Sequence, residues 1–147
     1  MRLFKNILVA TDCGPAAQRA ADIACDIAVG SSALVTLLHV WTVPLPSYAQ
    51  GLTFPLSEME AVGRQALHTE AARVRERSPG VTVKAVLLPG LAWRAVLEAI
   101  EEHGHDLVVM GTHGRKGLQH LFLGSIAEKV VRSAPVPVLT IRDPDDR

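Results

Sequence analysis

Short apolar runs alternate along this chain with segments in which apolar residues recur every three or four positions. Ile7–Ala10 and Asp106–Met110 are almost continuously apolar, a pattern typical of parallel strands that are buried on both faces. In the segment Ala20–Ala28 the apolar residues have helical spacing and are rich in alanine, which favours close packing on a sheet. The whole chain reads β-α-β-α-β-α-β-α-β, and such alternation requires a parallel sheet with right-handed connections and helices on both faces.

The predicted strands are Ile7–Ala10, Leu34–Trp41, Val81–Leu87, Asp106–Met110 and Val136–Ile141. A helix is expected from Leu56 to about Arg77, with Ser57 and Glu60 as a capping box. Gly30 is expected to be the C′ residue of the first helix. Because Pro137 has no N–H to donate, the last strand is expected at an edge of the sheet.

The most informative stretch is the glycine-rich loop that joins the fourth strand to the last helix. Gly111 and Gly114 open this loop, and Gly124 with Ser125 leads into the helix. Glycines allow backbone N–H groups to approach an anion closely, and a helix amino terminus favours negative charge. Arg115 adds a cationic donor, so the loop is interpreted as a cradle for a polyphosphate. The alternative is an ordinary loop whose glycines only make turns.

The spacing of this loop is G-x-x-G, nine residues, then G-[ST], with Gly111, Gly114, Gly124 and Ser125 in the fixed places. It resembles the ATP-binding signature of the universal stress protein family, and the resemblance extends from Lys5 to Ile141. The resemblance implies a single-domain doubly wound, five-stranded parallel sheet that is Rossmann-like and adenine nucleotide alpha hydrolase-like. It also implies an ATP ligand, with Mg²⁺ carried by the triphosphate and hydrolysis at most slow.

Asp12 ends the first strand, where a carboxylate can accept hydrogen bonds from ribose hydroxyls or can cap the following helix. On the residues alone both roles stay open. The resemblance places Ala10, Thr11 and Asp12 against the nucleotide, and it places the backbone of Val40 at the adenine edge. The complete predicted nucleotide-binding set is Ala10, Thr11, Asp12, Val40, Met110, Gly111, Thr112, Gly114, Arg115, Gly124, Ser125 and Ile126.

Composition narrows the functional classes. The chain has 147 residues, a formal net charge of zero and 48% hydrophobic residues, which predicts one domain over residues 1–147. Charge neutrality argues against a nucleic-acid or anionic-membrane partner. No apolar run approaches the roughly 18 residues of a membrane helix, and no signal-peptide layout is recognisable. The two cysteines have no metal-site spacing, and a cytoplasmic location is expected.

Three functions compete. The first is an ATP-binding stress-response regulator, and no general base or water-positioning residue for fast hydrolysis is recognisable. The second is a dimeric interaction module with an empty or incidental nucleotide site. The third, an adenylyl-transferring enzyme, is disfavoured because neither an S-G-G-x-D-S loop nor an H-x-G-H pair is present.

A homodimer is expected because Val136–Ile141 is apolar on both faces, and an exposed apolar edge strand has to be paired or covered. Antiparallel pairing of this strand with its copy in a second subunit is the simplest solution, and the family resemblance implies the same. The alternative is a monomer in which the tail Asp143–Arg147 folds back over the edge.

Overall fold

The computed structural model describes residues 3–42, 55–113 and 123–143. Within these ranges strands and helices alternate in the predicted order. The elements are β1 (Asn6–Ala10), α1 (Pro15–Ser31), β2 (Leu34–Trp41), α2 (Leu56–Arg77), β3 (Val83–Pro89), α3 (Ala92–His103), β4 (Leu107–Gly111), α4 (Ser125–Ser133) and β5 (Val138–Ile141).

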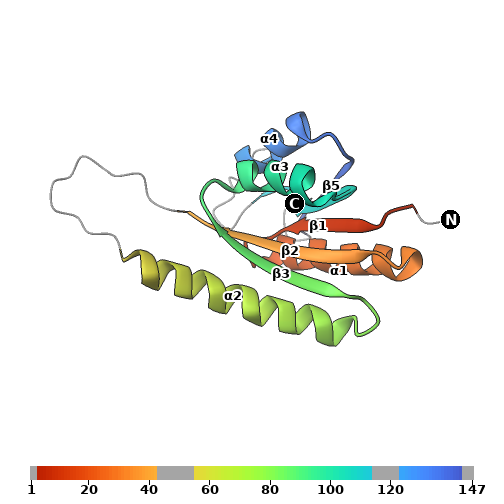
Figure 1. Ribbon diagram of the computed structural model, residues 1–147, viewed down its shortest axis with the longest axis horizontal. Coiled ribbons are helices and arrows are strands. Elements are labelled where there is room, and N and C mark those ends of the chain that lie inside the picture. Colours follow the sequence, from red (N-terminus) through yellow and green to blue (C-terminus); the bar gives the residue numbers. More distant parts are fainter. Residues whose placement is uncertain (1–2, 43–54, 114–122, 144–147) are drawn as a thin grey trace.

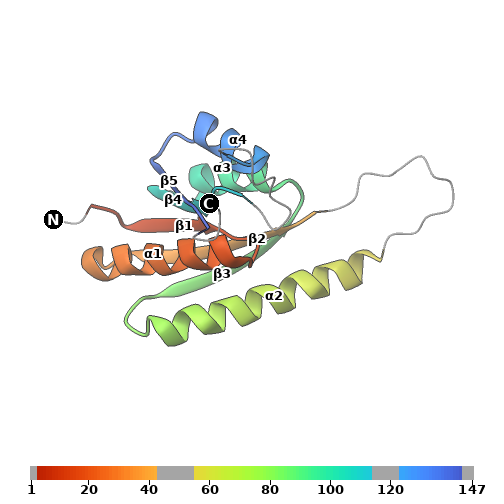
Figure 2. The same cartoon turned by 180° about the vertical axis from the view of Figure 1, so that it is seen from behind.

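The strands form one five-stranded sheet in the order β3-β2-β1-β4-β5, and every neighbouring pair is parallel. Helices α1 and α2 cover one face of the sheet, and α3 and α4 cover the other (Figures 1 and 2). The predicted doubly wound α/β fold is therefore confirmed. The expected edge position of the last strand is also confirmed.

Alternate residues of the central strand supply two separate hydrophobic cores. Ile7 and Val9 are fully buried in the core shared with α1 and α2, whereas Leu8 is fully buried in the core shared with α3 and α4. On α1 the contact face consists of alanines such as Ala20 and Ala24, which have no exposed surface. Small side chains let this helix lie close against the sheet, and its first turn thereby comes close to the strand ends.

The predicted capping box of α2 is wrong. The helix begins at Leu56, as predicted, but Pro55 is its N-cap and makes no side-chain hydrogen bond. Ser57 therefore already lies inside the first turn, where its hydroxyl is not in the N-cap position that the motif requires.

The predicted end of α1 is also wrong. The helix runs through Gly30 to Ser31, and Ser32 takes the left-handed conformation at φ 55° while its N–H donates to Ala28. In contrast, Gly104 closes α3 at φ 66°, which is the conformation that glycine adopts without steric cost.

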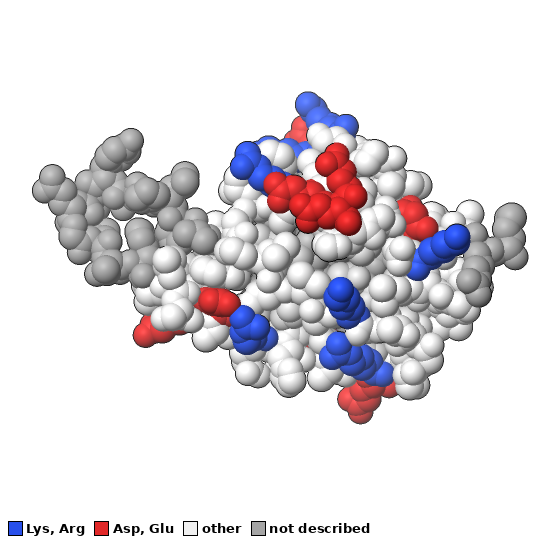
Figure 3. All heavy atoms as spheres, viewed as in Figure 1, with Lys and Arg blue, Asp and Glu red and all other residues white. Residues whose placement is uncertain are grey.

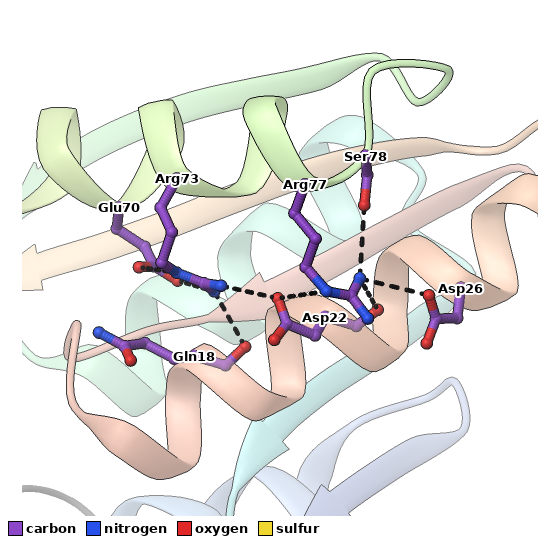
Figure 4. A network of polar contacts seen from close by, with 7 residues as sticks. All are labelled: Gln18, Asp22, Asp26, Glu70, Arg73, Arg77 and Ser78. Atoms are coloured by element: carbon purple, nitrogen blue, oxygen red, sulfur yellow. Dashed lines mark hydrogen bonds and ion pairs between the residues drawn. The ribbon is translucent and has the colours of Figure 1, made fainter.

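Two arginines of α2 reach across to α1 (Figure 4). The Arg73 guanidinium donates from Nε and Nη2 to the two carboxylate oxygens of Glu70, each at 2.9 Å, and from Nη1 to Asp22 at 3.0 Å. Arg77 contacts Asp22 at 3.6 Å and Asp26 at 3.3 Å. Because Asp22 meets both arginines, the two helices are joined by one continuous ionic network, named here the α1–α2 network.

Candidate nucleotide site

The predicted site lies where the sheet reverses its winding. Ala10 of β1 and Met110 of β4 are paired at the carboxyl ends of neighbouring strands. From β1 the chain passes to α1 on one face, and from β4 it passes to α4 on the other. Open α/β sheets bind their ligands at this switch point.

Two helix amino termini meet this edge with glycine at the N-cap. Gly14 precedes α1 and Gly124 precedes α4; both have extended backbone, and neither helix has a side-chain capping bond. Glycine at an N-cap costs only a few tenths of a kcal/mol relative to serine or aspartate. Glycine offers no side-chain acceptor at either N-cap, and the dipoles of both helices make this edge favourable for an anion.

Both glycines of the loop that the structure describes are held in tight contact. A Cβ on Gly111 would lie 3.0 Å from the Cβ of Ala16 in α1, and a Cβ on Gly124 would lie 3.1 Å from the carbonyl oxygen of Thr112. The Gly124 N–H also donates to that oxygen at 2.6 Å. The two ends of the predicted cradle therefore lie side by side, and a larger residue at either glycine would require its neighbour to shift by a few tenths of an ångström.

The loop between β1 and α1 is shaped by its own side chains. Thr11 Oγ1 accepts the Cys13 N–H at 2.9 Å, and Asp12 Oδ1 accepts the Gly14 N–H at 2.8 Å. These bonds hold Cys13 in the left-handed region at φ 64°, a conformation that costs a non-glycine residue about 1–2 kcal/mol. Asp12 is therefore not the N-cap of α1, because Gly14 has that position; it orders the turn before the helix.

The sequence did not indicate that the side chain of His39 belongs to this edge. Its Nδ1 lies 2.8 Å from the carbonyl oxygen of Thr11. A carbonyl can only accept a hydrogen bond, so Nδ1 carries the proton and donates. The signal available in the sequence was a polar residue near the carboxyl end of an apolar strand, directly before Val40.

The structure brings most of the predicted set together. Ala10 to Asp12 end β1, Met110 to Thr112 end β4, and Gly124 to Ile126 begin α4, while Val40 lies near the end of β2. Ser125 and Ile126 are exposed, whereas Thr11, Met110 and Thr112 are buried. Gly114 and Arg115 lie outside the described residues.

His103 ends α3, and His105 lies just before β4, near the amino end of that strand. No group of three or more His, Cys, Asp or Glu side chains suited to a metal occurs in residues 3–42, 55–113 and 123–143. His105 is buried, and within the same ranges its Nδ1 has no hydrogen-bond partner. Burial, followed by the charge of His103, lowers the pKa of His105.

Acidic and basic side chains are mixed on the face seen in Figure 3, and neither sign covers it. Among the described helices, none is both long and apolar enough to cross a membrane.

These features define an α/β protein of the doubly wound class with a candidate anion site at its switch point. The universal stress protein family model matches residues 3–142, and the chain belongs to that family. A universal stress protein of Thermus aquaticus, from the 3′ region of a sulfhydrylase gene, is 39% identical over 142 residues, which are 95% of this chain and 100% of that protein.

Solved structures agree with this assignment. The universal stress protein UspA of Lactobacillus plantarum has a TM-score of 0.78 at 26% identity, with 95% of this chain and 98% of that one covered. A universal stress protein crystallised in complex with cAMP has a TM-score of 0.71 at 22% identity, with 95% and 98% covered. At this identity the likeness to the cAMP complex concerns the fold alone.

Proposed function

We propose that this protein binds an adenine nucleotide, preferentially ATP with its Mg²⁺, and acts as a nucleotide-dependent regulatory protein of the stress response. The observation that carries the proposal is the meeting of two glycine-capped helix amino termini, those of α1 and α4, at the switch point of the sheet. The cAMP complex of a structural neighbour is consistent with an adenine nucleotide as ligand in this fold.

Each part of the edge suits one part of ATP. The N–H groups of Ser125 and Ile126 lie at the positive end of α4, where phosphate oxygens are favoured. In this proposal Gly114, which has a fixed place in the family signature, and the neighbouring Arg115 complete the phosphate contacts. Asp12, close to the paired strand ends, offers a carboxylate to ribose hydroxyls. The triphosphate itself carries Mg²⁺, since magnesium is usually held by few protein ligands together with substrate phosphates.

The test is isothermal calorimetry of ATP with Mg²⁺ on the wild type, Gly124→Val and Gly30→Ala. We expect Gly124→Val to lose binding, because the added Cβ would be pushed against the Thr112 carbonyl oxygen at 3.1 Å. Gly30→Ala is the matched control, since a Cβ there meets no atom within 4 Å. Circular dichroism confirms that each variant is folded.

Two outcomes would overturn the proposal. One is the absence of heat from ATP at millimolar concentration with wild-type protein. The other is a folded Gly124→Val variant that binds ATP as tightly as Gly30→Ala does.

A second candidate function, a dimeric interaction module, is favoured by the edge strand. Within the described residues β5 pairs with β4 on one side and with no strand on the other. Leu139 in this strand keeps 37% of its surface exposed. We therefore also propose a homodimer through the predicted strand Val136–Ile141. The two proposals are compatible, since the switch point and the β5 edge are different parts of the sheet.

A further inference from the structure

The hydrogen-bond ladder between β1 and β2 stops one step early. Even-numbered residues of β2 direct their backbone groups toward β1, as the bonds Leu34 N–H to Lys5 and Thr11 N–H to Leu38, both 2.9 Å, demonstrate. The next bond of a regular parallel ladder would run from the Val40 N–H to the Thr11 carbonyl. Among the backbone bonds of the described residues that one is absent, and the pairing ends at Ala10 with Leu38.

The imidazole of His39 occupies the missing position. Its Nδ1 donates to the Thr11 carbonyl oxygen at 2.8 Å, so the acceptor that Val40 would have used is bound by a side chain instead. Helix α2 passes close to the ring, since a Cβ on Gly63 would lie 3.6 Å from Cδ2 of His39, an ordinary van der Waals distance.

We propose that His39 is a positioning residue of the nucleotide site, one that holds Thr11 in place and releases the backbone of Val40 to read the adenine base. The inference rests on the proposed function. The N–H and C=O of one strand residue point in the same direction, and they supply a donor beside an acceptor. The Watson–Crick edge of adenine presents the complementary pair, the ring N1 acceptor and the 6-amino donor.

The same bond has a second effect on the site. Thr11 is held by β2 at both of its backbone groups, its N–H by Leu38 and its C=O by His39. Thr11 in turn binds the Cys13 N–H through its hydroxyl, and that turn carries Asp12. Loss of the imidazole donor therefore frees the Thr11 carbonyl, which then competes for the Val40 N–H and shifts the turn that presents the carboxylate.

The test compares ATP with purine riboside triphosphate, which lacks the 6-amino group, on the wild type and two variants of His39. His39→Phe keeps a ring but has no donor, and His39→Asn places an amide donor close to the position of Nδ1. We expect the wild type to prefer ATP by about tenfold, the equivalent of one hydrogen bond of about 1.4 kcal/mol, and His39→Phe to lose most of that preference. His39→Asn should restore it.

Val35→Ala is the matched control for general destabilisation, because Val35 is fully buried on the same strand, four residues before His39 and therefore on the same face of the sheet. It should lower stability and leave the preference for ATP unchanged. If His39→Phe does not fold, His39→Gln gives the same comparison, since its amide reaches the position of Nε2 and not that of Nδ1.

The outcomes separate this inference from the function on which it rests. Wild-type protein that binds no ATP overturns both. Wild-type binding with an unchanged ATP preference in folded His39→Phe or His39→Gln overturns only the role of His39. A variant that weakens both triphosphates by the same factor, without rescue by asparagine, also overturns it, because that is the result of a purely structural residue.

Discussion

The α1–α2 network predicts an unusually large effect for one substitution, Arg73→Met. Glu70 is 3% exposed, and both its carboxylate oxygens accept from the Arg73 guanidinium at 2.9 Å. Methionine keeps an unbranched apolar stem but removes every donor. Glu70 is then left as a buried carboxylate that has lost its guanidinium partner, and Asp22 and the Gln18 carbonyl lose the same donor.

The magnitude follows from the burial of the two partners. Removing one member of a fully buried ion pair costs about 3–5 kcal/mol, whereas an exposed pair contributes about 0–1 kcal/mol. The Arg73 side chain is 34% exposed, so water partly reaches the site that it vacates. We therefore expect a loss of about 2–3 kcal/mol in the free energy of unfolding. For a domain of this size that loss corresponds to about 5–10 °C in melting temperature.

Urea unfolding at pH 7 measures this loss, with Arg64→Met as the matched control. Arg64 makes a 2.7 Å pair with Glu60, but the two side chains are 67% and 44% exposed, so its loss should cost less than about 0.5 kcal/mol. The double variant Arg73→Met with Glu70→Met should be more stable than Arg73→Met alone, because it removes the unpaired carboxylate. Equal costs for Arg73→Met and Arg64→Met, or additive costs in the double variant, would refute this account of the network.

Two further predictions concern pH and assembly. Because the pKa of His105 is lowered in the folded protein, the unfolded chain binds more protons as the pH falls below about 6.5. The stability that neutral His105 contributes is therefore complete above that pH and is lost below it. The free energies of unfolding at pH 7.5 and pH 5.5 should differ less in His105→Leu than in the wild type. The same difference in both proteins would contradict this. Light scattering at low micromolar concentration should give a dimer mass for the wild type and a monomer mass for Leu139→Lys, and a monomeric wild type would eliminate the dimer.

The order and type of the elements were predictable because they depend on long periodic segments. The predicted bounds of β2 and of α2 agree with the structure. The third strand begins two residues later than predicted, because the Val81 N–H donates to the Ser78 carbonyl in a tight turn. The last strand begins at Val138 for a related reason: Pro137 precedes the strand and contributes only its carbonyl, which accepts from Val108.

The arrangement of the site was predictable only in part. Gly111 and Gly124 were identified from their spacing. At both positions the chain packs too closely for a larger side chain unless a neighbour shifts, and this requirement is visible in the sequence as a glycine. The bonds that shape the first loop join side chains to the backbone, as between Asp12 and Gly14 or between His39 and Thr11. Such bonds have no sequence period, and the second one joins residues 28 positions apart, so only the folded sheet brings its partners together.

Aspartate side chains make different hydrogen bonds at the two ends of the sheet, and this difference bears on function. At the amino end Asp106 accepts the N–H groups of Lys5 at 2.8 Å and Asn6 at 3.0 Å, which closes the start of β1. At the carboxyl end Asp12 binds within its own turn, and the helices that follow β1 and β4 begin at glycines without side-chain caps. Capping aspartates at Gly14 and Gly124 would add negative charge where both helix dipoles favour an anion. Because a Cβ at Gly124 would also crowd the Thr112 carbonyl oxygen, the test uses Gly14→Asp, which we expect to leave stability nearly unchanged and to weaken ATP far more than adenosine.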